Sequence, residues 1–208
     1  YKNLPRILSL FDSDLSSASY GFGDRFHWAW GLSDFANGTY QGAAHGFARL
    51  WVAGLWPYST SQSKFLERIN SLFIATRNII RKNGSLEEAF PNEGSYCVTA
   101  LVAFDLLCTL DLLKDTVDKP THDRWKNIIN PLIEYLLVSD EQHALISNHL
   151  ATAVAALFRW YDLTFDIRAD VKARLLLDRI IKGQSSEGWF TEYEGFDPGY
   201  QSLSTYYL

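Results

Sequence analysis

Cysteine is scarce in this sequence and methionine is absent. Only Cys97 and Cys108 occur among the 208 residues. On one helix they would lie about 16 Å apart along the axis, which is too far for a disulfide bond. Two cysteines therefore make neither a disulfide framework nor a zinc site. Because the sequence starts at Tyr1 and contains no methionine, we expect it to be a piece of a longer chain.

Concentrated basic segments and long apolar runs are also missing. The formal net charge is −5, which argues against nucleic acid as a partner because phosphate binding needs a concentrated basic surface. The longest apolar stretches, 98–113 and 150–161, are interrupted by charged residues. Neither reaches the roughly 18 apolar residues that a membrane span needs. We expect no membrane span and no signal peptide within this sequence, and its compartment and oligomeric state stay open.

Aromatic residues, by contrast, are abundant. The sequence holds 7 Trp, 11 Tyr and 13 Phe, or 15% of all residues, within an ordinary hydrophobic share of 47%. The length fits one medium domain. Because a core of this size needs fewer aromatic side chains, we expect some of them to lie in a cleft.

A repeat of about fifty residues organises the sequence. Four segments share one plan, a Gly-rich acidic loop followed by an apolar helix rich in small residues. These helices are predicted to begin near Tyr40, Tyr96, Asn148 and Tyr200, at spacings of 56, 52 and 52 residues. More amphipathic helices are predicted between them, at 61–81, 122–137 and 167–181. Strand-like alternation never extends far between turns, so we predict no sheet.

Apolar helices that alternate with amphipathic ones at this period predict an all-α fold, part of an α/α toroid in which helical hairpins form a ring. We expect residues 1–208 to form a single domain of this kind. In such a ring the loops before the inner helices all lie on one rim. Candidate functional residues are therefore sought in those loops.

Two of these loops match in detail. Gly84 is followed by an acid four and nine residues later and by Tyr96 twelve residues later, and the same pattern runs from Gly188 to Tyr200. Chance can also produce such a match in loops that are rich in acids and glycine.

The pair Asn148-His149 opens an otherwise apolar helix. In one interpretation Ser147 or Asn148 caps the helix and His149 is a hydrogen-bonded histidine at the edge of the core. In the other, both side chains point into a cleft. There an imidazole can transfer a proton near neutral pH, and the asparagine amide can hold a substrate carboxylate.

The predicted helical ring, the Asn148-His149 pair and the segment 197–207, an acidic Gly-containing loop that runs into a Ser- and Tyr-bearing helix, resemble the heparinase II/III and alginate lyase superfamily. The resemblance implies β-elimination of a uronate-containing polysaccharide without metal or cofactor. It implies that Asn148 and His149 neutralise the uronate carboxylate and that Tyr207 acts as base or acid, with Tyr200 and Tyr206 as rivals. Pro198 stands where the family usually has glycine, and a histidine after the catalytic tyrosine is missing.

Further rim residues are expected to bind the polysaccharide substrate. They are Arg25, Trp28, Glu88, Tyr96, Trp189, Glu192, Tyr193 and Asp197. Arg25 can pair with a substrate carboxylate or form a salt bridge to Asp24 or Asp34. The net charge of −5 weighs against a polyanionic substrate, because long-range steering would be repulsive.

Two alternatives remain open. A glycoside hydrolase on the same ring would use paired carboxylates, for which Glu88, Glu93, Glu192 and Asp197 are candidates, with Trp28, Trp189 and Tyr193 as sugar platforms; these acids can equally cap helices. A non-catalytic helical-repeat domain would bind glycan or protein on one face. Convergence of the acids and His149 on one pocket would favour an enzyme.

Overall fold

The computed structural model describes residues 2–23, 37–56, 60–88, 92–142, 145–193 and 195–208. Within these residues the chain is all-helical, as predicted. The described residues contain no strand, only the isolated antiparallel bridges Leu86–Ser95 and Glu192–Gly195. No described helix is long and apolar enough to cross a membrane.

The helices begin close to the predicted positions. They are α1 (Leu4–Leu8), the 3-10 turn η1 (Gly38–Gly42), α3 (Ala43–Val52), α4 (Gln62–Ile79), α5 (Tyr96–Leu112), α6 (Lys119–Val138), α7 (Ser147–Thr164), α8 (Ile167–Lys182) and α9 (Pro198–Tyr207). The starts of α5, α7 and α9 lie within two residues of Tyr96, Asn148 and Tyr200.

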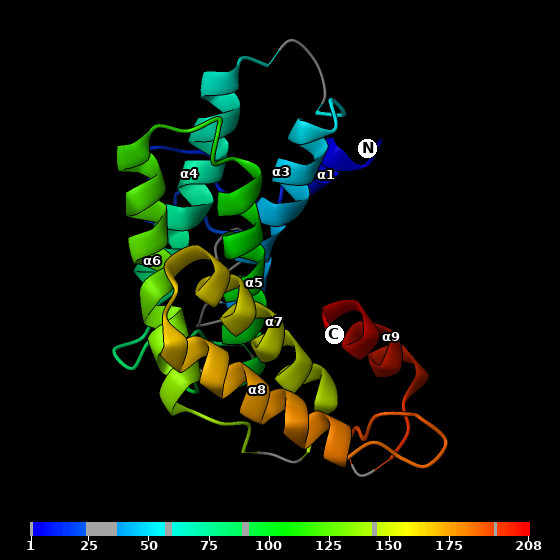
Figure 1. Cartoon of the computed structure of the whole chain (residues 1–208). Helices are drawn as coiled ribbons and strands as arrows, with labels where there is room; N and C mark the ends of the chain where they lie inside the picture. Colours follow the sequence, from blue (N-terminus) through cyan, green and yellow to red (C-terminus); the bar gives the residue numbers. More distant parts are fainter. Residues whose placement is uncertain (1, 24–36, 57–59, 89–91, 143–144, 194) are drawn as a thin grey trace.

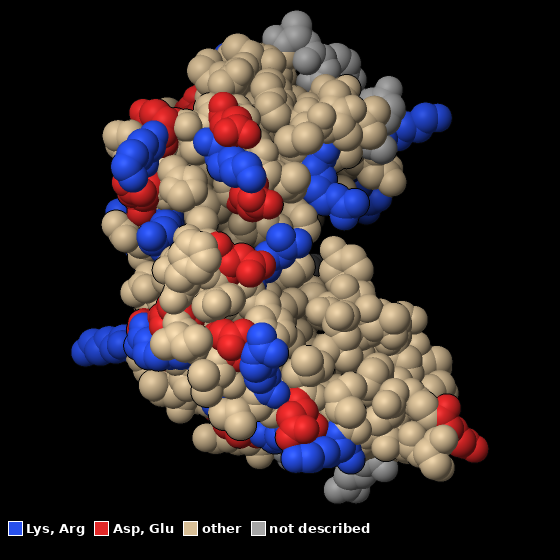
Figure 2. Space-filling view, viewed as in Figure 1, with Lys and Arg blue, Asp and Glu red and all other residues tan. Residues whose placement is uncertain are grey.

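The helices lie in two rows. Helices α3, α5, α7 and α9 pack side by side in chain order, and α4, α6 and α8 cover them from one side (Figure 1). Figure 2 shows a hollow in the surface between α9 and α3. It lies on the side of the α3–α5–α7–α9 row that faces away from α4, α6 and α8. The alternation of buried and amphipathic helices therefore corresponds to an inner and an outer row.

The core follows from this order. Helix α5 is apolar on nearly all sides and packs against α3, α6 and α7, as expected of a helix surrounded by others. Helix α7 buries a series of small residues, including Ala151, Ala153 and Ala156, which lets its neighbours approach closely. In the outer row, Phe73 of α4 stacks on Trp125 of α6 with ring centroids 4.4 Å apart.

The two matching loops share their backbone geometry. Gly84 and Gly188 both have φ of 91°, a region open to glycine and costly for other residues. The Arg81 N–H donates to the Ser85 carbonyl and the Gly84 N–H to the Arg81 carbonyl; 104 residues later Ser185 donates to Trp189 and Gly188 to Ser185. The same turn thus precedes α5 and α9.

Candidate functional site

A pocket of about 250 Å³ lies where the chain enters α5 and α7. The loops before α5, α7 and α9 all contribute side chains to it, so three of the four predicted rim loops come together here. Its lining consists of Glu88, Glu93, Gly94, Ser95, Tyr96, Cys97, Glu141, Ile146, His149 and Tyr193. Of the candidate residues named from sequence, Glu88, Glu93, Tyr96, His149 and Tyr193 meet in this pocket.

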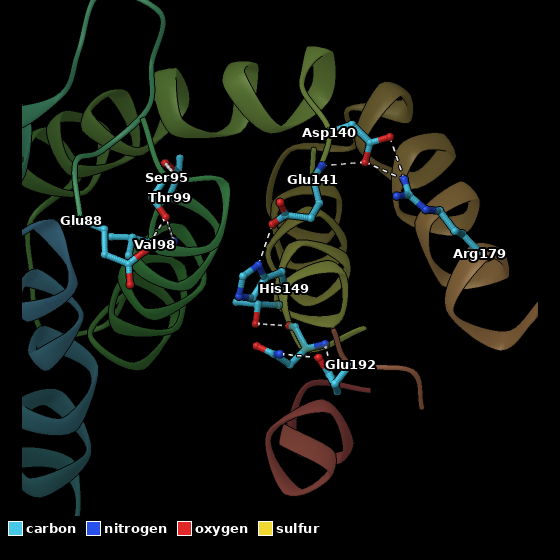
Figure 3. Close-up of polar contacts among 11 residues, drawn as sticks. Glu88, Ser95, Val98, Thr99, Asp140, Glu141, His149, Arg179 and Glu192 are labelled. Atoms are coloured by element: carbon cyan, nitrogen blue, oxygen red, sulfur yellow. Dashed lines mark hydrogen bonds and ion pairs between the residues drawn. The ribbon is translucent and has the colours of Figure 1, made fainter. Parts of the chain in front are cut away.

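His149 is held by a buried carboxylate. Its Nδ1 lies 2.6 Å from Oε2 of Glu141, and the side chains of His149 and Glu141 are 16% and 2% exposed. A carboxylate at Nδ1 favours the tautomer that carries its proton there, which leaves Nε2 able to accept a proton. Figure 3 shows this pair on one side of the site and Glu88 on the other, with the first turn of α5 between them.

The loop that carries Glu141 is itself anchored to the outer row. Asp140 accepts a hydrogen bond of 2.8 Å from the backbone N–H of Glu141 and two of 2.7 Å from Nη1 of Arg179 on α8 (Figure 3). Glu141 was not among the residues predicted from sequence. Its only sequence signal is that it is an acidic residue in the loop before α7, eight residues before His149.

Asn148 and Glu192 lie beneath the pocket rather than in it. Glu192 accepts hydrogen bonds from the Asn148 backbone N–H (2.8 Å), from Asn148 Nδ2 (2.7 Å) and from the hydroxyl of Ser204 (3.0 Å). Asn148 is 1% and Glu192 2% exposed. The Asn148 amide is thus directed at a protein carboxylate, and a substrate carboxylate does not reach it in this arrangement.

The prediction that Ser147 or Asn148 caps α7 is wrong. The N-cap residue is Ile146, which has no side-chain acceptor. The first free backbone donors of α7 are satisfied by the loop before α9 instead: Ser147 N–H donates to the Thr191 carbonyl (3.2 Å) and Asn148 N–H to Glu192. The negative charge of Glu192 also suits the positive end of the helix dipole.

Tyr193 forms an aromatic wall beside His149. Its ring centroid lies 6.4 Å from that of His149 at 87°, and 5.8 Å from that of Tyr200. The backbone of Tyr193 has φ of 45°, a left-handed conformation that is uncommon for a residue with a Cβ and that often marks functional positions. Tyr193 is 54% exposed, so its ring is open to a ligand.

Tyr96 and Cys97 line the pocket at the start of α5. Tyr96 is 5% exposed, and its buried hydroxyl has no hydrogen-bond partner in the described part of the chain. Burial raises the pKa of the Tyr96 phenol, and the neighbouring Asp140 and Glu141 raise it further. Burial likewise raises the pKa of the Cys97 thiol to about 12, so this cysteine is not an activated nucleophile.

The remaining predicted residues lie elsewhere. The ring of Tyr207 packs edge-on against Phe104, 5.1 Å away, and against Tyr206, 5.0 Å away, and neither tyrosine lines the pocket. Asp197 caps α9 by accepting from the Tyr200 N–H at 2.9 Å, which is its helix-capping interpretation.

Trp189 also lies outside the pocket lining, because its indole N–H donates to Glu187 and its ring packs near Phe196. Arg25 and Trp28 lie outside the described residues.

A second histidine–carboxylate pair joins α3 to α5. His45 Nδ1 lies 3.0 Å from Oδ1 of Asp105, and burial raises the pKa of Asp105 while His45 lowers it. In the sequence, Asp105 is one of the charged residues that interrupt the apolar stretch 98–113. Among the described residues, no group of three His, Cys, Asp or Glu side chains is placed to hold a metal ion.

No family model, no curated protein and no solved structure matches this chain.

Proposed function

We propose that the protein is a carbohydrate-active enzyme, built on part of an α/α toroid, that hydrolyses glycosidic bonds at the pocket between α5 and α7. The observation that supports this most is the composition of the lining. Glu88 and Glu93 contribute carboxylates from the loop before α5, and Glu141 and His149 contribute a carboxylate and an imidazole from the loop and helix that follow α6. The described lining contains no Lys or Arg.

The charge of the lining favours hydrolysis over elimination. Glycoside hydrolysis passes through a transition state that resembles an oxocarbenium ion, and fixed negative charges stabilise the positive charge that develops. Elimination instead adds negative charge to a sugar that is already anionic. Three glutamates around that sugar would raise the barrier, because like charges repel strongly in a partly dehydrated site.

In the proposed reaction the side chains have different roles. His149, polarised by Glu141 at 2.6 Å, acts as the general base that activates water. Glu88 is exposed on the opposite side, where its Oε2 accepts from the Ser95 hydroxyl at 2.8 Å, and acts as the general acid on the leaving oxygen. The exposed ring of Tyr193 forms a platform for the sugar.

β-Elimination of a uronate-containing polysaccharide is the second candidate. The neighbourhood of His149 and Tyr193 favours it, because a base and a phenol side by side can remove the proton and protonate the leaving oxygen. This reaction also needs a group that neutralises the uronate carboxylate. Asn148 is engaged by Glu192 and Tyr207 packs against Phe104, so the roles that the family resemblance implies would have to pass to other residues.

The two reactions give different products from one experiment. The chain is incubated with neutral, cationic and uronate-containing polysaccharides while new reducing ends and the ultraviolet absorbance of an unsaturated product are followed together. We expect reducing ends without absorbance, and a loss of at least about 10²-fold in rate for His149→Ala and for Glu88→Gln. The exposed Glu187 provides a matched control, Glu187→Gln, that should retain the full rate.

Other outcomes are equally informative. Absorbance that vanishes in His149→Ala would replace hydrolysis by elimination. Binding of a glycan without either product would support a non-catalytic binding domain. Cleavage that survives both His149→Ala and Glu88→Gln would place the chemistry outside this pocket.

A further inference from the structure

One side of the outer helix α8 faces the loop between α6 and α7. Lys172 and Arg179 lie two turns apart on α8 and therefore on the same side of the helix. Lys172 Nζ donates to the carbonyl oxygen of Ser139 at 2.9 Å. Arg179 Nη1 donates to both carboxylate oxygens of Asp140 at 2.7 Å. Two basic side chains of α8 thus hold the beginning of this loop.

The same side of α8 approaches the loop again, just before α7. Gly183, at the C-terminal end of α8, lies one turn after Arg179. A Cβ added to Gly183 would lie 2.7 Å from Cδ2 of Leu145, which is too close for two carbon atoms in contact. Helix α8 therefore contacts the loop on both sides of Glu141 in the sequence.

A chain of hydrogen bonds leads from α8 to the imidazole of the pocket (Figure 3). Arg179 fixes the Asp140 carboxylate, and Oδ1 of Asp140 accepts the backbone N–H of Glu141 at 2.8 Å. This bond orients the peptide between Asp140 and Glu141, and with it the direction in which the Glu141 side chain leaves the backbone. Oε2 of Glu141 then lies 2.6 Å from Nδ1 of His149.

We propose that Asp140 and Arg179 are positioning residues, which hold Glu141 where it keeps the proton of His149 on Nδ1. A carboxylate at Nδ1 fixes both the tautomer and the orientation of an imidazole that acts as a base. If the carboxylate turns away, the proton can move to Nε2, and the base is then blocked. The role of His149 as a base rests on the proposed function, but the position of its proton can be measured without any substrate.

Nuclear magnetic resonance of the chain with isotopically labelled histidine measures this position. The shifts of the two ring nitrogens distinguish the tautomers of a neutral imidazole, and His149→Gln identifies the signals of His149. In the unmodified chain we expect the proton on Nδ1. In Arg179→Ala we expect the ratio of the Nε2–H to the Nδ1–H tautomer to rise at least about fivefold, the effect of losing one net hydrogen bond.

The chain contains its own controls. His45 is an internal reference, because its Nδ1 lies 3.0 Å from Asp105 in a pair that joins α3 to α5. Its tautomer should not respond to Arg179→Ala. Arg174→Ala is the matched variant, since it removes an arginine of α8 that pairs with Asp170 of the same helix. It should leave the tautomer of His149 unchanged.

Two further variants test the link itself. Asp140→Ala removes the link from the side of the loop and should give the same shift as Arg179→Ala. Arg179→Lys should largely restore the signal of the unmodified chain, because one nitrogen of Arg179 contacts both oxygens of Asp140 and an ammonium can do the same.

The rate of glycan cleavage provides a second measurement. Arg179→Ala and Asp140→Ala should lower kcat at least about tenfold and change KM less than about twofold, because a misplaced base acts on the transition state rather than on binding. Arg174→Ala should keep kcat. Circular dichroism establishes that the variants are folded.

Failure of the inference and failure of the proposed function look different. An unchanged tautomer of His149 in both Arg179→Ala and Asp140→Ala would overturn the inference, as would an equal change in Arg174→Ala or a proton on Nε2 in the unmodified chain. The expected tautomer shift without cleavage of any glycan would support the inference and remove the hydrolase. Cleavage that depends on His149 but survives both Arg179→Ala and Asp140→Ala would do the reverse.

Discussion

Glu192 shows how a residue that looks catalytic in the sequence can serve the fold. It lies in an acidic rim loop, yet it is 2% exposed and accepts three hydrogen bonds from α7 and α9. A buried carboxylate is tolerated only when its oxygens are satisfied in this way. We therefore interpret Glu192 as a structural residue that links the start of α7 to α9.

This interpretation predicts a large loss of stability in Glu192→Ala. Asn148 and Ser204 would lose their acceptor, and α7 would lose its cap, so the free energy of unfolding should fall by about 3 kcal/mol. Urea unfolding followed by circular dichroism measures the change. Glu187→Ala, five residues earlier and exposed, should change stability by less than about 0.5 kcal/mol. A Glu192→Ala protein of normal stability that no longer cleaves glycans would mean that Glu192 is catalytic instead.

Tyr96 predicts a specific response to alkali. Burial raises the pKa of Tyr96 above its ordinary value of 10.0, so the folded chain holds this proton more tightly than the unfolded chain does. The contribution of this proton to the free energy of unfolding is fully present below pH 10. It is lost as the pH rises further, because Tyr96 then ionises readily only in the unfolded chain.

Tyr96→Phe removes this titration. We expect the midpoint of alkaline unfolding to move to higher pH. Stability at neutral pH should change by less than about 1 kcal/mol, because the hydroxyl has no hydrogen-bond partner among the described residues. Tyr206→Phe, at a residue that is 59% exposed, is the matched control and should leave the midpoint in place. An unchanged midpoint in Tyr96→Phe would contradict this expectation.

At the scale of elements, the two equivalent turns before α5 and α9 differ in what surrounds them. A Cβ on Gly84 would clash with the carbonyl oxygen of Pro131 in α6, whereas a Cβ on Gly188 would meet no described atom within 4 Å. Both glycines have the same φ, so the backbone strain of an alanine should be the same at the two positions.

The pair of substitutions therefore separates strain from packing. Gly188→Ala should cost about 1 kcal/mol from the left-handed backbone alone. Gly84→Ala should cost about 3 kcal/mol, since the contact with α6 adds an overpacking penalty. Thermal unfolding of both variants checks this difference. Equal losses would show that α6 moves aside without resistance.

The sequence predicted the elements that depend on neighbours along the chain. The starts of α5, α7 and α9 follow from a local change from Gly-rich acidic loop to apolar periodicity. The amphipathic pattern predicts a start of α6 at His122, three residues late; Asp118 as N-cap and Pro120 in the first turn mark the true start. Contacts over long sequence distances were missed. The cap of α7 comes from Glu192, 44 residues away, and no local pattern reveals it.

The same limit applies to the candidate site. Each of the candidates that meet in the pocket lies in a predicted rim loop or at the start of an inner helix. These candidates are Glu88, Glu93, Tyr96, His149 and Tyr193. The sequence could not predict that His149 lines the pocket while its neighbour Asn148 is buried. Which of two adjacent residues at a helix start is covered depends on where the neighbouring loop packs. The burial of Asn148 is decided by Glu192, and thus by packing between repeats.

At the scale of the whole molecule, the chain is an array in which each inner helix mainly contacts its neighbours in the row and the outer helices beside it (Figure 1). Helices α5 and α7 have inner-row partners on both sides and bury most of their residues. Helix α9 buries only Ser204 and α1 only Leu4. Stability in such arrays is roughly a sum of repeat and interface contributions, so it should be distributed unevenly along the chain.

Hydrogen exchange followed by mass spectrometry tests this distribution. We expect the amides of α5 and α7 to exchange most slowly, through openings that approach global unfolding, and those of α1 and α9 to exchange fastest through local fraying. In Glu192→Ala, faster exchange should appear first in α9 and in the first turn of α7, because the hydrogen bonds between them are lost. The amides of α4 and α5 should stay protected. If α9 were as protected as α5 in the unmodified chain, or if Glu192→Ala accelerated exchange equally everywhere, the chain would unfold as one cooperative unit. The Glu192 carboxylate would then stabilise the whole array rather than one interface.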